Sequence, residues 1–353
     1  MKTRIIVLLS FFSITLFGQT KYANAFLNIG VDAAAFGLAN AVVAQTQDAN
    51  AIYWNPAGLV HIEDSEITLM HAAYFANIAQ YEHVAYARNI DKKSAIGASL
   101  IRFAVDDIMN TTQLIDANGN VDYNRISLFS AADYALHLSY ARRARNEDFS
   151  YGINVKIIHR RIGDFATSFG FGADLGLQYQ KNNWNYGLML RDITTTFNTW
   201  SFNEDQLATI QAAIPGQNQT APENTEITAP KAQFGIARKF DLHYDNYLTP
   251  EIDLTMRFSK THDIFSSEVL SINPAIGVAF TYHDFAFLRV GIGNFQYQTS
   301  FTGQNELTMQ PNIGLGFTYR GITVDYALTN IGGQDSVLYS NIFSVKIDLG
   351  AFR

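Results

Sequence analysis

Four oxygen-bearing residues at alternate positions are the first candidates for chemistry: Asp116, Asn118, Asn120 and Asp122. Carboxylate and amide oxygens at this spacing open the loop of an EF-hand calcium site. The pattern then fails, because that loop needs glycine at its sixth position, where Val121 stands, and glutamate at its twelfth, where Ser127 stands. Asn118-Gly119 is also typical of a tight hairpin turn. A hairpin tip is therefore the better interpretation, and calcium binding stays a weak alternative.

Histidines supply possible catalytic bases, but no nucleophile pattern accompanies them. Acyl transfer needs a nucleophile beside the base, and no serine stands in a glycine elbow. Phosphate-binding glycine loops, cysteine-based metal sites and His-Glu-x-x-His helices are also missing from the sequence. We therefore predict neither catalysis nor a cofactor. The histidines weighed for a catalytic role are His83, His137, His159, His243, His262 and His283.

A larger set of polar residues alternates with apolar ones. In residues 169–180 the odd positions carry Phe, Ala, Leu and Tyr, whereas the even ones carry glycine, Asp174 and glutamine. One apolar face and one small or polar face suit a strand between lipid and a wet lumen. Side chains on the second face should pair across that lumen. The residues expected to face it are Asp133, His137, Asn154, Lys156, Arg160, Asp174, Gln178, Arg191, Asp325, Lys346 and Asp348.

The elements that must position these residues are about fourteen strands, most of them near the roughly 9–11 residues that a tilted membrane strand needs. An even number of antiparallel strands can close into a barrel without exposed edges. The chain is 48% hydrophobic and 16% charged, with its apolar residues dispersed. We predict an all-β fold, an antiparallel transmembrane β-barrel over residues 65–353. The strands lie near 65–74, 80–90, 94–106, 131–142, 149–161, 169–180, 184–192, 229–240, 247–260, 272–282, 285–296, 309–319, 322–328 and 340–352.

Residues 1–18 read as a signal peptide, with Lys2 and Arg4 before an apolar stretch too short to span a membrane. Cleavage after Gly18 is favoured, and Ala25 ends a second candidate site. Without cysteine, neither a lipid-modified N-terminal cysteine nor a disulfide can form. Acidic residues outnumber basic ones, 32 to 25, which disfavours nucleic acid as a partner.

Tight polar turns alternate with longer loops between the strands. Placing the tight turns in the periplasm puts both termini there and the long loops outside. Residues 107–130 and 193–228 are the longest outer loops, and residues 204–214 could form a helix within the second. Such loops either hold a partner or serve as polar covers. Arg160 and Arg161, at the outer end of a strand, could meet lipopolysaccharide phosphates.

Residues 19–64 lack strand alternation and are rich in alanine and glycine. Small residues let a backbone pack tightly inside a lumen, so this segment is predicted to be a hatch. The hatch motif is Gly30, Asp48, Trp54, Asn55, Pro56, Ala57, Gly58 and Leu59. Its Asn-Pro-Ala-Gly core is a turn signal, because proline fixes φ and glycine tolerates positive φ.

The run from Phe26 to Leu59 resembles the N-terminal block of the PorV/PorQ family, a branch of the FadL-like outer-membrane barrels. The shared pattern is Phe-Leu-x-Ile-Gly, an alanine- and glycine-rich middle, an aspartate before small residues, and Tyr-Trp-Asn-Pro-Ala-Gly-Leu. One departure is Asp32 with the residues that follow it, where members commonly carry an arginine and a Gly-Met-Gly step. This departure leaves the subgroup open.

The resemblance implies a barrel with an N-terminal hatch in the outer membrane of a Gram-negative cell, in contact with lipid and lipopolysaccharide. It further implies a non-enzymatic component of type IX protein secretion or surface attachment. In that role the outer loops and rim would dock sorting-domain cargo or a translocon. The alternative is a FadL-like channel that takes up hydrophobic small molecules.

Overall fold

The computed structural model describes residues 23–74, 77–115, 119–213, 223–300, 303–329 and 340–352, with the backbone alone for residues 209–213. The predicted signal peptide, residues 1–18, lies outside the described residues. In the part of the chain that is described, no helix has both the length and the apolar character to cross a membrane.

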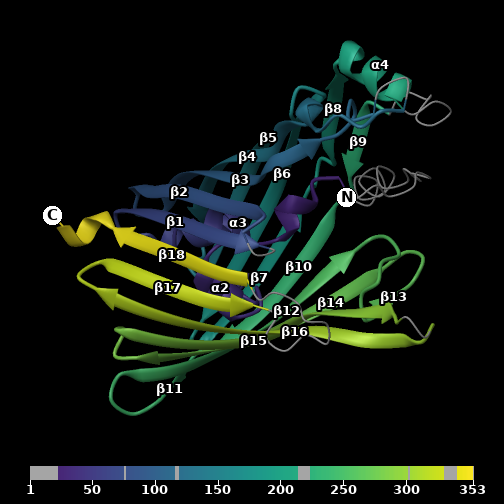
Figure 1. Ribbon diagram of the computed structural model, residues 1–353. Helices are drawn as coiled ribbons and strands as arrows, with labels where there is room; N and C mark the ends of the chain where they lie inside the picture. Colours follow the sequence, from purple (N-terminus) through teal and green to yellow (C-terminus); the bar gives the residue numbers. More distant parts are fainter. Residues whose placement is uncertain are drawn as a thin grey trace, which may run out of the picture.

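Fourteen antiparallel strands form a closed barrel, as the sequence predicts (Figure 1). Closure is made by β1 and β18, which pair from Glu66 opposite Asp348 to Ala73 opposite Asn341. Closure leaves no sheet edge to face lipid. The barrel strands are β1 (Ser65–Tyr74), β2 (Ala79–Asp91), β3 (Ser94–Asn110), β4 (Ser127–Arg143), β5 (Phe149–Ile162), β6 (Ala166–Lys181), β7 (Trp184–Arg191), β10 (Lys231–Arg238), β12 (Asn246–Arg257), β14 (Ser271–Tyr282), β15 (Ala286–Thr299), β16 (Asn305–Tyr319), β17 (Ile322–Thr329) and β18 (Ser340–Asp348).

Several predicted boundaries differ from the structure. The last strand, predicted to reach residue 352, ends at Asp348, because the Asp348 carboxylate accepts a hydrogen bond from Gly350 N and turns the chain into a 3-10 helix, η5 (Leu349–Phe352). The long loops are also shorter than expected. β3 and β4 extend into the first, and the second contains β8 (Thr196–Phe202), the predicted helix α4 (Glu204–Ala213) and β9 (Thr225–Thr228).

One side of the barrel wall is therefore much taller than the other. β3 and β4 have 17 residues each, whereas β17 has 8. At about 3.3 Å per residue, these lengths correspond to roughly 56 and 26 Å along the strand. Figure 1 shows β8, β9 and α4 projecting beyond the opposite wall. Two short pieces, β11 (Phe240–Asp241) and β13 (Phe265–Ser266), pair with β12 and β14.

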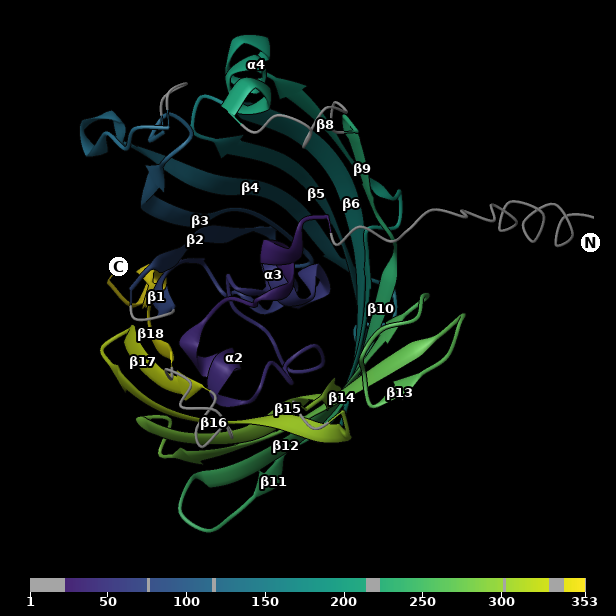
Figure 2. The same cartoon turned by 45° about the vertical axis from the view of Figure 1, so that its right-hand side comes forward.

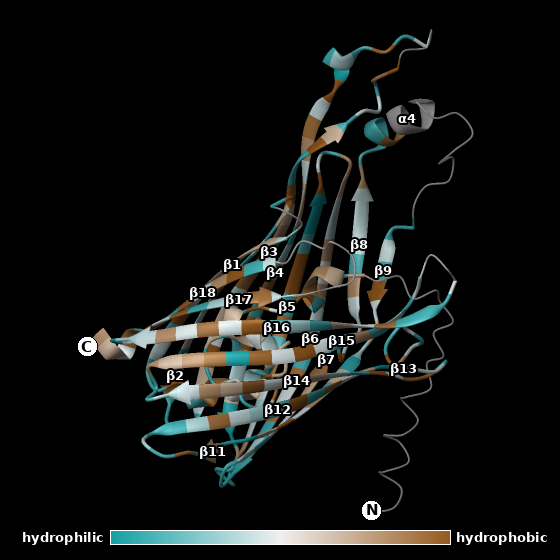
Figure 3. Ribbon diagram, turned by 60° about the horizontal axis from the view of Figure 1, so that its bottom comes forward, coloured by the Kyte–Doolittle hydropathy of each residue, from teal (hydrophilic) through white to brown (hydrophobic). Residues whose placement is uncertain are grey.

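The two faces of the wall differ in the expected way. In β6 the side chains of Phe169 and Phe171 are 63% and 64% exposed on the outside, whereas Asp174 and Gln178 are buried inside. Figure 3 shows the resulting alternation of apolar and polar residues along the strands. An apolar outer face matches lipid, and the polar inner face needs partners inside the barrel.

Those partners come largely from the N-terminal segment, residues 23–64, which we call the hatch segment. Figure 2 shows it inside the barrel. It contains η2 (Ala25–Asn28), α2 (Ala33–Gly37), α3 (Ala51–Trp54) and η3 (Pro56–His61). α2 packs against β15 to β18, and η3 packs against β2 to β6 on the opposite wall. Most of its apolar side chains are buried, so the hatch segment forms the core of the molecule.

Inward glycines of the wall make room for the hatch backbone. A Cβ atom on Gly152 would lie 2.5 Å from the carbonyl carbon of Pro56, and one on Gly187 would lie 2.3 Å from the carbonyl oxygen of Val43. Both distances are far below a van der Waals contact. Close approach of the hatch backbone therefore explains these two glycines on the polar face of the strands.

The ends of the barrel differ. The C-terminal helix η5 lies at one end with mostly tight turns, and the longest connections share the other end, together with short ones between β1 and β2 and between β5 and β6. Ala23, the first described residue, accepts a hydrogen bond from Thr228 of β9, on the long-loop half. The residues before it lie outside the described part, so the predicted periplasmic start of the chain stays a prediction.

Candidate functional site

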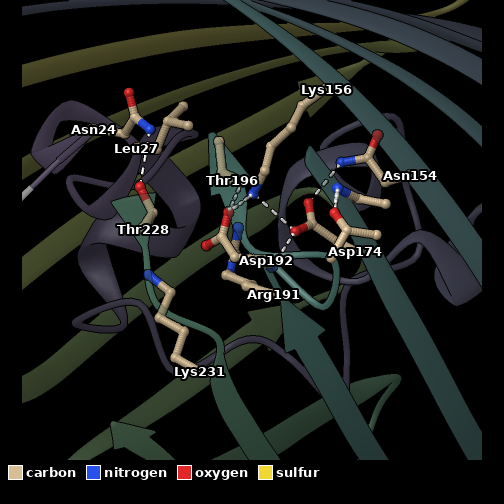
Figure 4. Close-up of polar contacts among 12 residues, drawn as sticks. Asn24, Leu27, Asn154, Lys156, Asp174, Arg191, Asp192, Thr196, Thr228 and Lys231 are labelled. Atoms are coloured by element: carbon tan, nitrogen blue, oxygen red, sulfur yellow. Dashed lines mark hydrogen bonds and ion pairs between the residues drawn. The ribbon is translucent and has the colours of Figure 1, made fainter. Parts of the chain in front are cut away.

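Buried polar and charged residues gather in the lumen, between the hatch segment and the wall. Its central group is Lys156 of β5, whose Nζ lies 2.8 Å from Asp174 of β6 and 2.5 Å from Asp192 (Figure 4). The side chains of Lys156, Asp174 and Asp192 are at most 7% exposed. Asn154 donates to the second oxygen of Asp174 over 3.1 Å. Buried ion pairs such as those of Lys156 with Asp174 and Asp192 are tolerated when further hydrogen bonds satisfy the charged groups.

This group lies where the wall changes course. β7 ends at Arg191, and residues Asp192 and Thr195 have positive φ before β8 begins. Asp192 N donates to the Asp174 carboxylate over 2.8 Å, and Thr196 donates to Asp192 over 2.5 Å. The network therefore holds together a break between β7 and β8. The sequence did not indicate Asp192, which follows the last residue of a strand.

The other residues expected to face the lumen make separate contacts. Arg160 Nε is 2.8 Å from Asp133 and Arg289 Nη1 is 2.6 Å from Asp325, while Arg191 lies over the Tyr53 ring at 4.4 Å. Lys346 reaches the hatch residue Asp48 over 3.1 Å. Asp348 bonds its own turn, as described above. Gln178 donates to Thr46 O.

The contact proposed between Arg160 and lipopolysaccharide is wrong. Arg160 is turned inward, where it binds Asp133 and Glu226 and lies 5.0 Å from the Trp200 ring centre. Its neighbour Arg161 is exposed and forms an ion pair with Asp164 over 2.8 Å. The alternation along β5 accounts for this, since successive side chains point to opposite faces.

The hatch motif residues hold the segment in place. Asn55 Nδ2 donates to Val43 O and to Leu177 O of β6, both over 3.0 Å, and its Oδ1 accepts from Ala57 N. Trp54 Nε1 donates to Val31 O over 3.0 Å. Pro56, Ala57, Gly58 and Leu59 are all buried.

Two glycines of the motif are required by close packing. Gly30 has φ +110, which an L side chain rarely adopts, and a Cβ atom there would lie 3.2 Å from Trp54. A Cβ atom on Gly58 would lie 2.1 Å from Thr46 O. Asp48 accepts a hydrogen bond from Asn50 N, in addition to its ion pair with Lys346.

Two carboxylates on β12, which the sequence analysis missed, also bind the hatch backbone. Asp253 Oδ2 accepts hydrogen bonds from Val42 N and Val43 N over 3.0 and 3.1 Å, and Glu251 Oε1 accepts from Ala44 N over 2.7 Å. Both side chains are buried. The signal was available, because Glu251, Asp253 and Thr255 are alternate polar residues of a predicted strand.

Burial shifts the pKa values of the hatch residues Asp32 and His61. It raises the pKa of Asp32 to about 7, helped by the negative charges of Asp48 and Asp325. Asp32 accepts hydrogen bonds from Ser344 Oγ and Ala34 N, which oppose the shift only in part. Burial lowers the pKa of His61 to about 4, and the positive charge of Arg143 adds to this.

The weak calcium candidate gains no support. Asp116 and Asn118 lie outside the described residues, and Asp122 is engaged in its own turn, where its carboxylate accepts from Asn124 N and binds Arg125. Ile115 and Val121 form an antiparallel bridge and Gly119 has φ +83, as in a hairpin tip. Among the described residues, no group of three potential ligands could hold a metal ion.

One serine and histidine do meet in the lumen. Ser99 Oγ lies 3.4 Å from His137 Nδ1, but both residues are at most 3% exposed beneath the hatch segment. His83, also buried, has no hydrogen-bond partner for either ring nitrogen in the described residues. This long contact between two buried groups gives no support to a catalytic role.

Comparisons with known proteins agree with this architecture. In fold, the chain is similar to the toluene transporter TbuX of Ralstonia pickettii, with a TM-score of 0.54 and 13% identity over 90% of this chain and 98% of that one. The Pseudomonas putida toluene transporter TodX has a TM-score of 0.53 and 12% identity over 90% of this chain and 96% of that one. A FadL homologue of Pseudomonas aeruginosa has a TM-score of 0.52 and 12% identity over 90% of this chain and 97% of that one.

At such low identity these structures establish the fold alone, an outer-membrane barrel of the FadL type. No curated protein sequence matches the chain. The family model described as "Type IX secretion system protein PorV" matches residues 19–255, which is more than half of the chain. The chain therefore belongs to the PorV family of type IX secretion system proteins, and is an outer-membrane β-barrel.

Proposed function

We propose that this barrel is a non-enzymatic docking component of type IX secretion, which holds sorting-domain cargo or the translocon through its outer loops and rim. The PorV family supplies the link to that system. The tight-turn end would face the periplasm, and the tall wall of β3 to β6, with β8, β9 and α4, would rise above the membrane.

The observation that carries this proposal is the apolar surface of the tall wall. Met109 of β3 and Leu128 of β4 are paired residues on the outer face, 68% and 60% exposed. Ile115, Val121 and Tyr123, in the connection between these strands, are more than half exposed. An apolar membrane band is only about 25 Å tall. Apolar side chains near the end of a much longer wall therefore favour a protein partner.

The alternative, a channel for hydrophobic molecules, shares the fold of the toluene transporters. It needs an apolar route through the lumen. The described lumen instead contains a cavity of about 330 Å³ lined by polar side chains such as Asn40, Gln233, Asn273 and Asn312, and the hatch segment is bound by buried carboxylates. These features support docking over uptake.

Deletion of the gene, followed by profiling of surface and secreted proteins, tests the proposal. We expect loss of sorting-domain proteins from the surface, restored by the wild-type gene. The double variant Met109→Asp with Leu128→Asp should restore it poorly, whereas Tyr244→Asp, a change of an exposed residue in a turn at the opposite end of the barrel, should restore it fully. Unchanged cargo together with reduced uptake of a lipophilic compound would favour the channel.

A further inference from the structure

Three cations stand in one row across three neighbouring strands. Arg191 of β7 is the register partner of Lys231 of β10, and Lys231 is the register partner of Arg257 of β12. All three residues line the cavity of about 330 Å³ described above. Like charges directly opposite each other destabilise a sheet, so the row needs a compensating partner.

The described residues compensate only one of the three charges fully. Arg257 Nη1 lies 2.6 Å from the Asp263 carboxylate. Lys231 donates to the neutral side-chain oxygen of Asn28, and Arg191 Nε donates to the neutral Gln233 over 2.6 Å. Neither Arg191 nor Lys231 forms an ion pair within 4 Å of a carboxylate in the described part of the chain.

Arg191 is the residue that most favours anion binding in this cavity. The residue is 5% exposed, and its Nη2 atom has no hydrogen-bond partner among the described residues. The guanidinium is held in place by the Tyr53 ring and by Gln233. Leaving a buried charged donor unsatisfied is costly, whereas an anion would satisfy it.

The carboxylates nearby form no ion pair with Arg191 or Lys231 in the described residues. Asp174 and Asp192, next to Arg191 along the wall, both bind Lys156 (Figure 4). Asp253 lines the cavity, where its Oδ2 accepts two backbone hydrogen bonds from the hatch segment and its Oδ1 has no hydrogen-bond partner among the described residues. An external anion would give Arg191 and Lys231 the direct partner that these carboxylates do not.

The rest of the lining defines the kind of anion. Amide and hydroxyl groups surround the row, among them Asn40, Asn273, Asn312 and Thr255, and they suit a ligand rich in hydroxyl groups. The volume lies at the lower end of the range for small-molecule pockets. Arg257 and Thr329 are the last residues of β12 and β17, so the cavity lies at the long-loop end of the lumen.

We propose that this cavity binds a hydrophilic, sugar-sized oxyanion, whose carboxylate or phosphate lies between Arg191 and Lys231. The site lies within the lumen and is separate from the docking surface of the tall wall. Its ligand is held by charge and by hydrogen bonds, unlike a hydrocarbon.

Isothermal titration of the purified full-length barrel in neutral detergent at low ionic strength tests this. Glucuronate and glucose 6-phosphate are the two anionic probes, glucose is the neutral match, and decanoate is an apolar carboxylate. We expect saturable binding of at least one sugar anion, weakened by added salt, and none of glucose. The anion that binds with the higher affinity shows whether the site prefers a carboxylate or a phosphate.

Variants locate the binding. Lys231→Gln should weaken binding of the sugar anion at least tenfold. It should also raise the melting temperature of the ligand-free barrel, because the repulsion of Lys231 by Arg191 and Arg257 is removed. Lys260→Gln, which removes one exposed cation outside the cavity, should change neither. The proposal is overturned if wild-type protein binds no sugar anion, if Lys231→Gln binds it equally well, or if decanoate alone binds. Since the purified barrel is used, a negative result here leaves the secretion role untouched.

Discussion

Asn55 of the hatch segment donates a hydrogen bond from Nδ2 to the carbonyl oxygen of Leu177 in β6 over 3.0 Å, and so joins the hatch to the barrel wall. The same nitrogen donates to Val43 O. We predict that Asn55→Asp, which turns this donor into an acceptor facing two carbonyl oxygens, weakens hatch docking by roughly 1–3 kcal/mol. Faster amide hydrogen exchange in residues 33–61, with the strands unchanged, is the measurement.

Asn203→Asp is the matched control. The Asn203 side chain caps α4 by accepting hydrogen bonds from Asp205 N and Gln206 N, a role that aspartate fills equally well. Hatch exchange should stay at the wild-type rate in this variant. Equal exchange in both variants would show that the Asn55 bonds do not hold the hatch.

The inward glycines give a second prediction. Gly152→Ala would bring a methyl group to 2.5 Å from the backbone of Pro56, so η3 must move. Overpacking of this kind costs about 1–3 kcal/mol. Chymotrypsin, which can cut the hatch at Phe36 or Tyr53, should cleave the variant several-fold faster.

Gly293→Ala is the comparison. Its added methyl group has no neighbour nearer than 3.3 Å, so a small adjustment accommodates it. Cleavage of this variant should match the wild-type protein. If the two glycine variants are cleaved equally slowly, the hatch does not depend on close backbone approach at β5.

The strands could be predicted because alternation is a local property of each segment. Phe171 faces outward and Asp174 inward, as their parity in 169–180 requires. The break after β7 could not be predicted, because it depends on Asp192 meeting Asp174 and Lys156, residues distant in sequence. The continuation of the wall into β8 and β9 depends likewise on pairing across polar segments that resemble loops.

The small residues of the hatch motif indicated tight packing, but not its partners. Gly152 lies nearly a hundred residues from Pro56, and only the closed barrel brings them together. The cation row was hidden for the same reason. Lys231 and Arg257 each stand singly in the sequence, and the register of three strands aligns them with Arg191.

A pH dependence of hatch docking follows from Asp32. Burial raises its pKa from 3.8 to about 7 in the docked state, so docking favours the protonated acid. The stability that protonated Asp32 contributes to hatch docking is therefore lost as pH rises from about 4 to 7, and the loss is nearly complete above pH 7. Between pH 6.5 and 8, the contribution of Asp32 to hydrogen-exchange protection of residues 33–37 should fall roughly three- to fivefold after correction for intrinsic rates, partly offset by His61 in the wild-type protein.

Asp32→Asn should abolish this fall. His61→Gln is the control from the same segment. The pKa of His61 is lowered from 6.5 to about 4 on docking, so its contribution is lost as pH falls below 6.5, the opposite direction. Protection in His61→Gln should therefore still fall between pH 6.5 and 8. A fall that persists in Asp32→Asn would assign the dependence to another group.

The buried ion pairs at the wall break give the last prediction. Lys156→Met would remove the cation that pairs directly with the Asp174 and Asp192 carboxylates, at a cost of roughly 3–5 kcal/mol. Lys260→Met removes an exposed pair with Glu268 and should cost less than about 1 kcal/mol. Urea unfolding in detergent micelles measures both. Adding Asp192→Asn to Lys156→Met should recover part of the loss, because it removes one of the two carboxylate charges. If the two lysine variants unfold at the same urea concentration, the Lys156 network does not stabilise the junction of β7 and β8.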